Sequence, residues 1–307
     1  MSKRQREARE AARRALLAKR QAEARRKRLV LAGGAVALVL VLFAVLVVVK
    51  LAGGGAKPTS ATPATSGSAA AAVTAAVTSV PASVLDQVGA GKVNGLPSAI
   101  KGQARLTDGG KPLVLYVGAE YCPFCAAQRW AVVVALSRFG TFDGLKVSAS
   151  AADDTFPNTP TLSFYGATYR SDYLAFQGVE TTTNVRQGQG YQPLQALTDA
   201  QQKIVATYNA PPYVAKDSAG SIPFIDYANQ AVSVGASFSP QLLAGMTAEQ
   251  VAQAVNDPKS DIGQAVGGSA NAIAALLCRL TGNQPAAVCG SPAVQAYAGK
   301  FNDVAVS

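Results

Sequence analysis

Histidine is missing from this chain of 307 residues, and its absence removes several classes of catalytic site. Without an imidazole the protein cannot use a Ser-His-Asp or Cys-His mechanism, and it cannot hold zinc through histidine. The HExxH helix of many metalloproteases is excluded for the same reason. Several large classes of hydrolase are therefore ruled out before any motif is considered.

Net charge is also nearly absent from most of the chain, although the whole protein carries +10. Residues 1–28 contain twelve of the 28 lysines and arginines but only three of the 18 acidic residues. The rest of the chain is almost neutral and lacks the basic stripe that a folded nucleic-acid-binding surface needs. We therefore expect no nucleic-acid partner, and the basic residues form a tail.

A long apolar run, LVLAGGAVALVLVLFAVLVVV, follows this tail at residues 29–49. About 20 such residues are needed for a helix to cross the hydrocarbon core of a membrane. The apolar region of a cleavable signal peptide is usually shorter, and a buried core helix is rarely so long and unbroken. Because the bases precede the run, the positive-inside rule predicts a cytoplasmic N-terminus. We expect a single-pass signal-anchor in the cell membrane, with the C-terminal domain extracytoplasmic.

The segment from residue 50 to residue 80 consists mainly of Gly, Ala, Pro, Ser and Thr. This composition lacks the varied apolar residues that pack a core, so we expect a flexible linker. Residues 81–307 then form one extracytoplasmic domain that is long enough to bury a core.

Within this domain, runs typical of strands alternate with runs typical of helices. The continuous apolar run at residues 112–118 is expected for a strand buried on both faces. Thr247 followed by Gln250 is a capping-box pattern that marks the start of a helix. The predicted strands are residues 112–118, 145–150, 222–229 and 231–238, and residues 161–165 and 173–179 are shorter pieces that are strand-like or irregular. The predicted helices are residues 126–139, 193–208, 247–256 and 269–280. This order predicts an α/β fold with a central mixed sheet.

All four cysteines, Cys122, Cys125, Cys278 and Cys289, follow the predicted membrane span. An even number of cysteines in an oxidising compartment suggests disulfides, with three possible pairings. The first two form the CPFC motif, residues 122–125, between a predicted buried strand and a predicted helix. The N-terminus of that helix favours the thiolate of Cys122, the attacking species in thiol–disulfide exchange. Cys125, one turn later, can displace Cys122 from a mixed disulfide.

The segment AEYCPFC, residues 119–125, resembles the active-site segment of thioredoxin-fold oxidoreductases, and its Pro-Phe dipeptide is similar to the Pro-Tyr dipeptide of glutaredoxins. The resemblance implies the order strand, CxxC helix, strand, helix, proline, hairpin and helix. It also implies a cis-proline facing the motif, and Pro223 occupies that position ahead of the predicted hairpin. The residues expected to line the substrate groove are then Tyr121, Pro123, Phe124, Ile222 and Pro223.

More narrowly, the chain resembles DUF929, a membrane-anchored thioredoxin-like family of unknown function. The resemblance covers roughly residues 81–291 and lies in the anchor, the late cysteine pair and the segments AEYCPFCAAQRW, TPTLSFYG, SIPFIDYANQ and LCRLTGNQPAAVC. It implies a thioredoxin-like fold and a redox motif, without naming a substrate.

Two departures from thioredoxin change what the resemblance implies. Thioredoxin has a buried aspartate six residues before its first cysteine, and this chain has Tyr116 there. We therefore expect a potential in the glutaredoxin range of roughly −200 to −230 mV rather than a thioredoxin-like reductant. The second departure is the stretch of residues 151–192, which is rich in Tyr and Phe. It exceeds what the fold requires, and we expect an insertion that covers the site or contacts a partner.

Other interpretations of the cysteines and their neighbours stay open at this point. The CPFC pair could be an inert disulfide, whereas a four-cysteine zinc site is disfavoured because a second closely spaced pair is missing. For Cys278 and Cys289 a structural bridge that pins a turn is favoured over a second relay pair. Glu120 could transfer protons or be an exposed carboxylate before the helix. Tyr121 and Trp130 are favoured as packing residues over substrate contacts.

The sequence leaves two hypotheses about function, one for an enzyme and one for a non-catalytic binding protein. In the first, the protein is a membrane-anchored, extracytoplasmic thiol–disulfide oxidoreductase that acts on envelope proteins or on a membrane redox partner. Cys122 is its nucleophile, Cys125 its resolving cysteine, and no metal or other cofactor is expected. In the second, it is a non-catalytic binding or scaffold module with structural disulfides, and residues 151–192 dock the partner.

Overall fold

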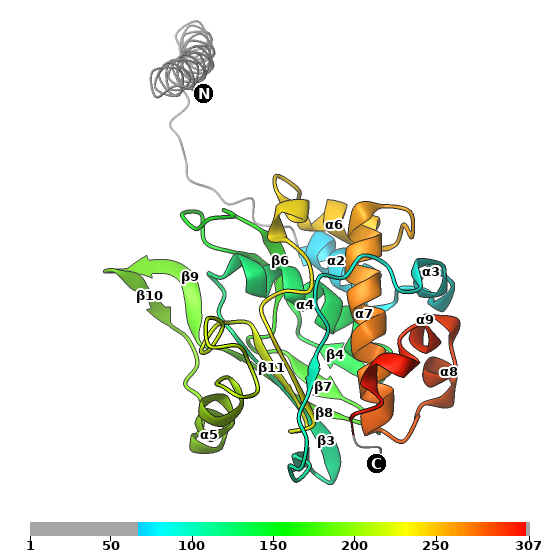
Figure 1. Cartoon of the computed structure of the whole chain (residues 1–307). Helices are drawn as coiled ribbons and strands as arrows, with labels where there is room; N and C mark the ends of the chain where they lie inside the picture. The colour runs from blue at the N-terminus through cyan, green and yellow to red at the C-terminus, as the bar shows by residue number, and fades with distance from the viewer. Residues whose placement is uncertain (1–66, 305–307) are drawn as a thin grey trace, which may run out of the picture. The chain divides into compact units, whose positions relative to one another are not determined.

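The central sheet is organised around strand β3 (Lys111–Gly118) in the computed structural model, which describes residues 67–304. Strand β3 pairs in parallel with β8 (Ala175–Glu180) and antiparallel with β11 (Phe224–Tyr227). Three further strands complete the sheet: β12 (Ala231–Val234), β1 (Ser98–Ala99) and β2 (Thr107–Asp108). The sheet is mixed and combines with helices, so the α/β prediction is confirmed (Figure 1).

Both faces of β3 are buried, which accounts for its continuous apolar sequence. Successive side chains of a strand point to opposite faces of the sheet. Val114 and Tyr116 accordingly belong to the larger core, whereas Leu115 and Val117 belong to a smaller core on the other face. All four side chains are at most 4% exposed. The predicted strand at residues 112–118 is thus confirmed as the buried centre of the fold.

Helices cover both faces of this sheet (Figure 1). On one face α4 (Pro123–Leu136) packs against α7 (Asp261–Leu280), and Trp130 of α4 is fully buried in the larger core. On the other face α5 (Asp199–Tyr208) contributes Tyr208 to the smaller core. Further helices are α6 (Ala248–Val255), α8 (Ala286–Cys289), α9 (Pro292–Gln295) and the 3-10 helices η1 (Pro240–Leu243) and η2 (Ala298–Phe301).

Capping residues fix where two of these helices begin. At α6 the hydroxyl of Thr247 accepts the backbone N–H of Gln250, and the Gln250 side chain accepts the backbone N–H of Thr247. This is the predicted capping box, which satisfies two helix donors at once. Helix α5 has the same device in Thr198 and Gln201, so it begins at Asp199 rather than at the predicted residue 193.

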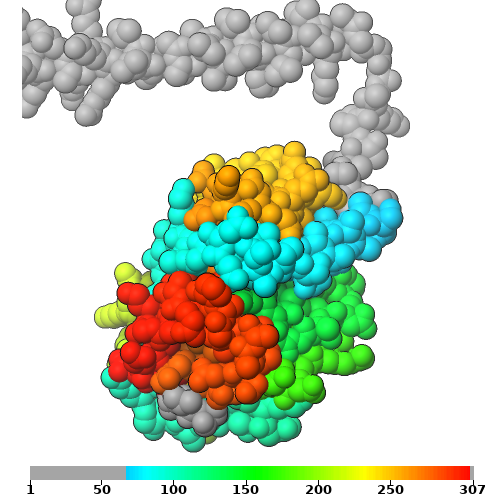
Figure 2. All heavy atoms as spheres, turned by 90° about the vertical axis from the view of Figure 1, so that its right-hand side faces the viewer, coloured from blue at the N-terminus to red at the C-terminus, as the bar shows by residue number. Residues whose placement is uncertain are grey.

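The C-terminal half of the predicted linker, residues 50–80, is a helix. Helix α2 (Gly67–Thr78) buries Val73 and Val77, and helix α3 (Ala82–Val88) follows it. Figure 2 shows the blue and cyan spheres of α2 and α3 beside the yellow and orange spheres of the α6 region. The linker prediction is wrong from residue 67 onward, because alanine favours helix and two valines four residues apart suffice to join the core.

The predicted cytoplasmic tail, residues 1–28, and the predicted transmembrane helix, residues 29–49, lie outside the described residues. In the part of the chain from residue 67 to residue 304, no single helix is long and apolar enough to span a membrane. Helices α2 and α3 meet that criterion only as a pair, with a bend of 61° between them.

The stretch of residues 151–192, predicted as an insertion, contributes β8 to the central sheet. Residues 146–149, within the strand predicted at 145–150, pair instead with residues 160–163 outside that sheet. In β8, Gly178 lets Phe164 pack closely, because a Cβ there would lie 2.7 Å from the Phe164 Cβ. The strands outside the central sheet form the pairs β4 (Thr141–Asp143) with β7 (Thr168–Arg170), β5 (Lys146–Ala149) with β6 (Pro160–Ser163), and β9 (Thr182–Gln187) with β10 (Gly190–Pro193). The insertion prediction is therefore wrong in its limits.

Candidate functional site

Cys122 occupies the N-cap of helix α4, shortly after β3 ends. Pro123 is the first helical residue, a position where the missing N–H of proline is not needed. The Cys122 Sγ accepts a hydrogen bond from the backbone N–H of Cys125, with a sulfur to nitrogen distance of 3.2 Å. The predicted placement of this thiol at a helix N-terminus is confirmed.

The two thiols of the CPFC motif differ in burial and in pKa. Cys122 is 5% exposed and Cys125 is fully buried, and the two are not bonded to each other. A hydrogen bond from the Cys125 side chain lowers the pKa of Cys122 against the effect of burial, and backbone N–H groups and the Arg129 charge add to the lowering. Burial raises the pKa of Cys125 well above its usual value, and the neighbouring Cys122 raises it further. The surroundings therefore lower the pKa of one thiol and raise the pKa of the other.

The segment ahead of β11 faces Cys122, one hundred residues away in the sequence. The Ile222–Pro223 peptide bond is cis, as the resemblance implies. The Cys122 thiol donates a hydrogen bond to the Ile222 carbonyl oxygen, at a sulfur to oxygen distance of 3.9 Å. Ile222 is half-buried and packs against the two cysteines, while Pro223 is buried. The structure thus brings the predicted groove residue Ile222 next to Cys122.

Glu120 is buried, so its interpretation as an exposed carboxylate is wrong. Its side chain is 6% exposed, and its two carboxylate oxygens accept hydrogen bonds from the hydroxyls of Ser148 and Ser163. Its backbone N–H donates to the Thr182 carbonyl at 2.9 Å. The serines come from strands β5 and β6, and no local pattern in the sequence places these strands over Glu120.

A buried ion pair next to the cysteines was not predicted. Arg129 of α4 and Glu180 of β8 are both 0% exposed, and the guanidinium donates from Nε at 2.8 Å and from Nη2 at 2.6 Å to the two carboxylate oxygens. Nη2 also donates to the Ala119 carbonyl at 2.8 Å. The same carbonyl accepts the backbone N–H of Cys122 at 3.3 Å. The one signal in the sequence is an arginine inside an otherwise largely apolar helix.

Tyr116 is the third group in this buried cluster. Its hydroxyl has no hydrogen-bond partner among the described residues, and its ring centroid lies 6.0 Å from the guanidinium carbon of Arg129. Burial raises the pKa of Tyr116 well above its usual value, so the phenol is neutral. The buried acid of the cluster is Glu180, which the sheet register sets opposite Gly118 of β3, two residues after Tyr116.

Tyr121 connects the CPFC motif to the hairpin formed by β9 and β10. Its ring stacks on Tyr191 with centroids 4.3 Å apart and planes inclined by 7°. The Arg186 guanidinium lies over the Tyr191 ring, with its central carbon 4.4 Å from the ring centroid. Asp153 accepts hydrogen bonds from both Tyr191 and Arg186. Tyr121 is half-buried and packs against the β9–β10 hairpin beside the CPFC motif.

Phe124, between the two cysteines, is exposed. Its side chain is 42% exposed, and its ring meets Phe156 edge to face at a centroid distance of 5.8 Å. Trp130, by contrast, is fully buried, and its indole N–H donates to the Pro160 carbonyl at 2.9 Å. Of the aromatic residues on α4, Phe124 is thus the one available to a partner, and Trp130 packs the core as predicted.

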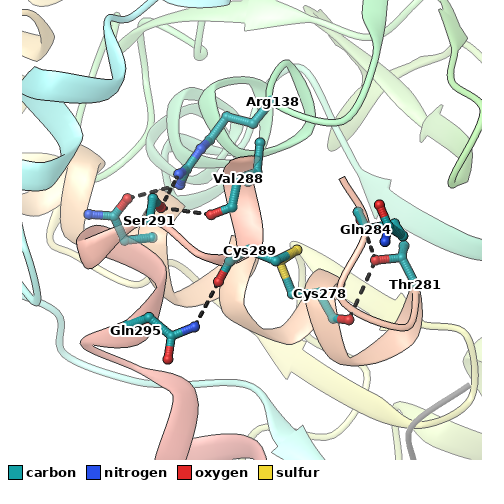
Figure 3. The surroundings of a disulfide bond; sticks show 9 residues. Arg138, Cys278, Thr281, Gln284, Val288, Cys289, Ser291 and Gln295 are labelled. Carbon is teal, nitrogen blue, oxygen red and sulfur yellow. Dashed lines mark hydrogen bonds between the residues drawn. A yellow bond between two sulfur atoms is a disulfide. The ribbon is translucent and has the colours of Figure 1, made fainter. Parts of the chain in front are cut away.

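Cys278 and Cys289 form the predicted disulfide (Figure 3). Their Cα atoms are 5.6 Å apart, and the bond joins the last turn of α7 to the end of α8. Both residues are buried. Close by, Arg138 near the end of α4 donates to the Ser291 hydroxyl at 3.0 Å, so this corner is also tied to the neighbouring helix.

The four cysteines do not share a metal site. Two of them are bonded to each other, and Cys122 and Cys125 are the free ones in the described chain. Among residues 67–304, no group of three or more Cys, Asp or Glu side chains is arranged to hold a metal ion. The disulfide leaves two thiols, fewer than a four-cysteine zinc site requires.

The site lies within the range that a known family covers. A family model described as a domain of unknown function, DUF929, matches residues 99–279, which is more than half of the chain. This range contains the CPFC motif, the Ile222–Pro223 bond and the Arg129–Glu180 ion pair. Neither a curated protein nor a solved structure matches the chain. On this match, the chain belongs to the DUF929 family of unknown function.

Proposed function

We propose that this protein is a membrane-anchored, extracytoplasmic thiol–disulfide oxidoreductase in which Cys122 attacks and Cys125 resolves. The observation that carries the proposal is the asymmetry of the CPFC pair. Hydrogen bonding lowers the pKa of Cys122 at the helix N-terminus, whereas burial raises the pKa of Cys125. The thiolate is the attacking species, so Cys122 is the thiol that meets an external disulfide first.

The order of the elements supports a thioredoxin-like fold. The core elements follow one another in the order that the resemblance implies: β3, α4, β8, α5, Pro223, the β11–β12 hairpin and α7. Because β8 runs parallel to β3 and β11 runs antiparallel to it, the CPFC motif and Ile222 meet at the same end of the sheet. On this interpretation the strand pairs β4–β7, β5–β6 and β9–β10 are additions around a common core.

The reaction we propose is a two-step exchange. The Cys122 thiolate attacks a sulfur of a substrate disulfide, the substrate S–S bond breaks, and one substrate sulfur leaves as a thiolate. Cys125 then loses its proton and attacks the Cys122 Sγ, which releases the second substrate thiolate and forms the Cys122–Cys125 disulfide. Two electrons pass to the substrate, whose thiolates take up the two protons. Run in reverse, the protein disulfide oxidises a substrate dithiol.

The surroundings of Cys122 favour a polypeptide substrate. The Ile222 carbonyl lies beside the sulfur and can accept a backbone N–H from an extended chain, and the exposed Phe124 offers an apolar contact. We therefore propose envelope proteins, or a membrane redox partner with a disulfide or dithiol, as substrates. The predicted anchor at residues 29–49 would hold the site at the extracytoplasmic membrane surface.

Trapping of mixed disulfides tests this proposal. In Cys125→Ala the second step is blocked, so the full-length protein should accumulate in cells as mixed disulfides. These adducts should migrate as separate bands on non-reducing gels, and a reductant should return them to the position of the unmodified protein. Cys122→Ala and the double variant should show none. If Cys125→Ala captures no more than these controls, and the purified protein has no reversible dithiol titration, the oxidoreductase proposal fails.

A non-catalytic docking role is the second candidate, and the β9–β10 hairpin is the observation that favours it. Val185 in this hairpin is 52% exposed, and its neighbour Arg186 takes part in the stack on Tyr191. If docking is the function, Cys122→Ala leaves the cellular function intact and a shortened hairpin abolishes it. The oxidoreductase proposal expects the loss in Cys122→Ala.

A further inference from the structure

We propose that the buried Arg129–Glu180 ion pair sets the reactivity of the CPFC cysteines, with Arg129 favouring the Cys122 thiolate and Glu180 limiting that effect. Arg129 and Glu180 are positioning residues in this account, since they act on the thiols and touch no substrate. The biological meaning of the inference rests on the proposed function, but the effect on thiol ionisation exists whether or not the protein is an enzyme.

The helix geometry places Arg129 on the same side as both cysteines. Arg129 follows Cys125 by four residues and the N-cap Cys122 by seven, and residues at these spacings share one face of a helix. Its side chain cannot turn away, because Nη2 and Nε are both fixed on Glu180. The charge is therefore held in one place relative to the thiols.

A hydrogen-bonded bridge connects this charge to the nucleophile. The Ala119 carbonyl accepts Nη2 of Arg129 at 2.8 Å and the backbone N–H of Cys122 at 3.3 Å. On the helix side, the Thr161 hydroxyl donates to the Ala126 carbonyl at 2.8 Å and lies 3.5 Å from Nη1 of Arg129. The guanidinium is thus tied to the chain on both sides of the CPFC motif.

Stability alone gives a weak reason for such a pair. Removing two charges from water is costly, and well-packed apolar residues of similar volume often replace a buried ion pair without loss of stability. Inside a protein, however, a fixed charge acts on its neighbours more strongly than in water. A pair placed next to two thiols therefore has a clear electrostatic consequence, which an apolar replacement would lack.

The titratable groups around the thiols come from β3, β8, α4 and the segment just before α4. Glu180 lies on β8, Glu120 precedes α4, and the neutral phenol of Tyr116 comes from β3. Arg129 is the positive group in this set. The Arg129 charge lowers the pKa of Cys122, although the hydrogen bond from Cys125 and burial have larger effects. The same charge lowers the pKa of Cys125, whereas Glu180 raises it. At Cys125 the two members of the pair therefore act with opposite sign, and we expect the same opposition at Cys122.

This opposition gives a test that a purely structural role does not pass. The full-length reduced protein is treated with iodoacetamide over a range of pH, and the rate of Cys122 modification is followed by mass spectrometry of the peptide. Arg129→Met should move the rate profile to higher pH, because the thiolate loses a favourable charge. The rate on the acidic side of the profile falls about tenfold when the thiol pKa rises by one. Glu180→Gln should move the profile to lower pH, and Arg129→Lys should stay near the wild type.

The outcomes separate this inference from the proposed function. Opposite shifts in Arg129→Met and Glu180→Gln support it, even if Cys125→Ala traps no substrate. Shifts in the same direction, or none, in variants with native circular dichroism overturn it, even if trapping succeeds. If Arg129→Met does not fold, Glu180→Gln decides alone: a shift to lower pH supports the inference, and an unchanged or higher profile overturns it.

Discussion

The two cysteine pairs of this protein lie at opposite kinds of helix end. Cys122 caps the N-terminus of α4 and is separated from Cys125 by two residues, and both are unbonded. Cys278 lies in the last turn of α7, and its disulfide to Cys289 spans a sequence separation of 11. A helix N-terminus favours a thiolate, whereas a C-terminus opposes negative charge. The position of a cysteine on its helix thus differs between the free pair, which we propose to be reactive, and the disulfide-bonded pair.

The surroundings of the two pairs sharpen this difference. Around the CPFC motif, backbone N–H groups and the Arg129 charge act on the sulfur of Cys122 and lower its pKa, and the Ile222 carbonyl faces it. Around the disulfide, hydrogen bonds such as that from Gln295 to the Cys289 carbonyl hold the backbone. The first site orients groups toward a sulfur, and the second orients groups toward the chain.

Loss of Cys122 has the largest expected effect. With oxidised glutathione as the probe, the reduced wild-type protein should form the Cys122–Cys125 disulfide, because Cys122 attacks and Cys125 resolves. With Cys122→Ala, the rate at which oxidised glutathione is consumed should fall to the rate measured without protein, because the remaining Cys125 is fully buried. The matched control is Cys278→Ala/Cys289→Ala, which should keep the wild-type rate. Loss of exchange in that folded control would mean that the second pair relays electrons, and the comparison would break.

The pH dependence of stability should reveal Asp226, a group on the sheet face away from α4. Burial raises its pKa from 3.8 to about 7. The folded state then keeps a proton that the unfolded state releases, so stability falls as the pH rises from about 4 to about 7. Relative to Asp226→Asn, the wild type should lose up to about 4 kcal/mol over this range. Urea unfolding at several pH values measures it.

Asp226→Asn also serves as a control for the alkylation of Cys122. Asp226 titrates in the pH range in which a reactive thiol would also titrate. Because Asp226 lies on the sheet face away from α4, Asp226→Asn should leave the pH profile of Cys122 alkylation unchanged. If Asp226→Asn changed both the pH dependence of stability and the pH profile of Cys122 alkylation, Asp226 would act on the CPFC site. A flat difference in stability between the wild type and Asp226→Asn would contradict the raised pKa.

Removal of the disulfide should affect stability without affecting the thiols. Cys278→Ala/Cys289→Ala releases a short loop, which should lower the free energy of unfolding by about 3 kcal/mol. Denaturant unfolding of the wild type under non-reducing conditions is the reference. The rate of Cys122 alkylation should be equal in both proteins. A stability change below about 1 kcal/mol would argue against a structural role for this pair.

Phe124→Ala should produce the smallest change in stability. Its side chain is 42% exposed, so we expect unfolding free energies to agree within about 0.5 kcal/mol. The reaction with a disulfide-containing peptide should nevertheless slow, because the apolar contact beside Cys122 is lost, while the reaction with small oxidised glutathione stays unchanged. Phe156→Ala tests the neighbouring ring in the same way. Equal effects on both substrates would mean that Phe124 acts on the thiol rather than on the partner.

Local signals in the sequence are enough to predict the start of the site. The buried strand β3, the cysteine before α4 and the proline at the first position of α4 lie close together in the sequence. The capping box at Thr247, elsewhere in the chain, likewise depends only on neighbouring residues. These features depend on backbone geometry near one position, so the structure agrees with them. The pairing of Cys278 with Cys289 is similarly local.

Contacts between distant side chains could not be predicted, except for the approach of Ile222–Pro223 to Cys122, which the resemblance implies. Arg129 and Glu180 are 51 residues apart, and their contact depends on the pairing of β3 with β8. The sequence of β8, AFQGVE, contains Gln and Gly and lacks the continuous apolar pattern of β3, so it does not mark a central strand. The alanine-rich sequence of α2 has the low variety typical of a linker, although alanine favours helix.

The reduction potential of the Cys122–Cys125 pair decides whether this pair exchanges electrons while the second pair stays bonded. Equilibration of the purified full-length protein with glutathione buffers, followed by mass spectrometry of alkylated peptides, reports both pairs in one experiment. We predict a reversible transition of the CPFC pair at roughly −200 to −230 mV, with the Cys278–Cys289 disulfide intact until below about −300 mV. A CPFC pair that shows no reversible transition, or that resists reduction together with Cys278–Cys289, would contradict the account.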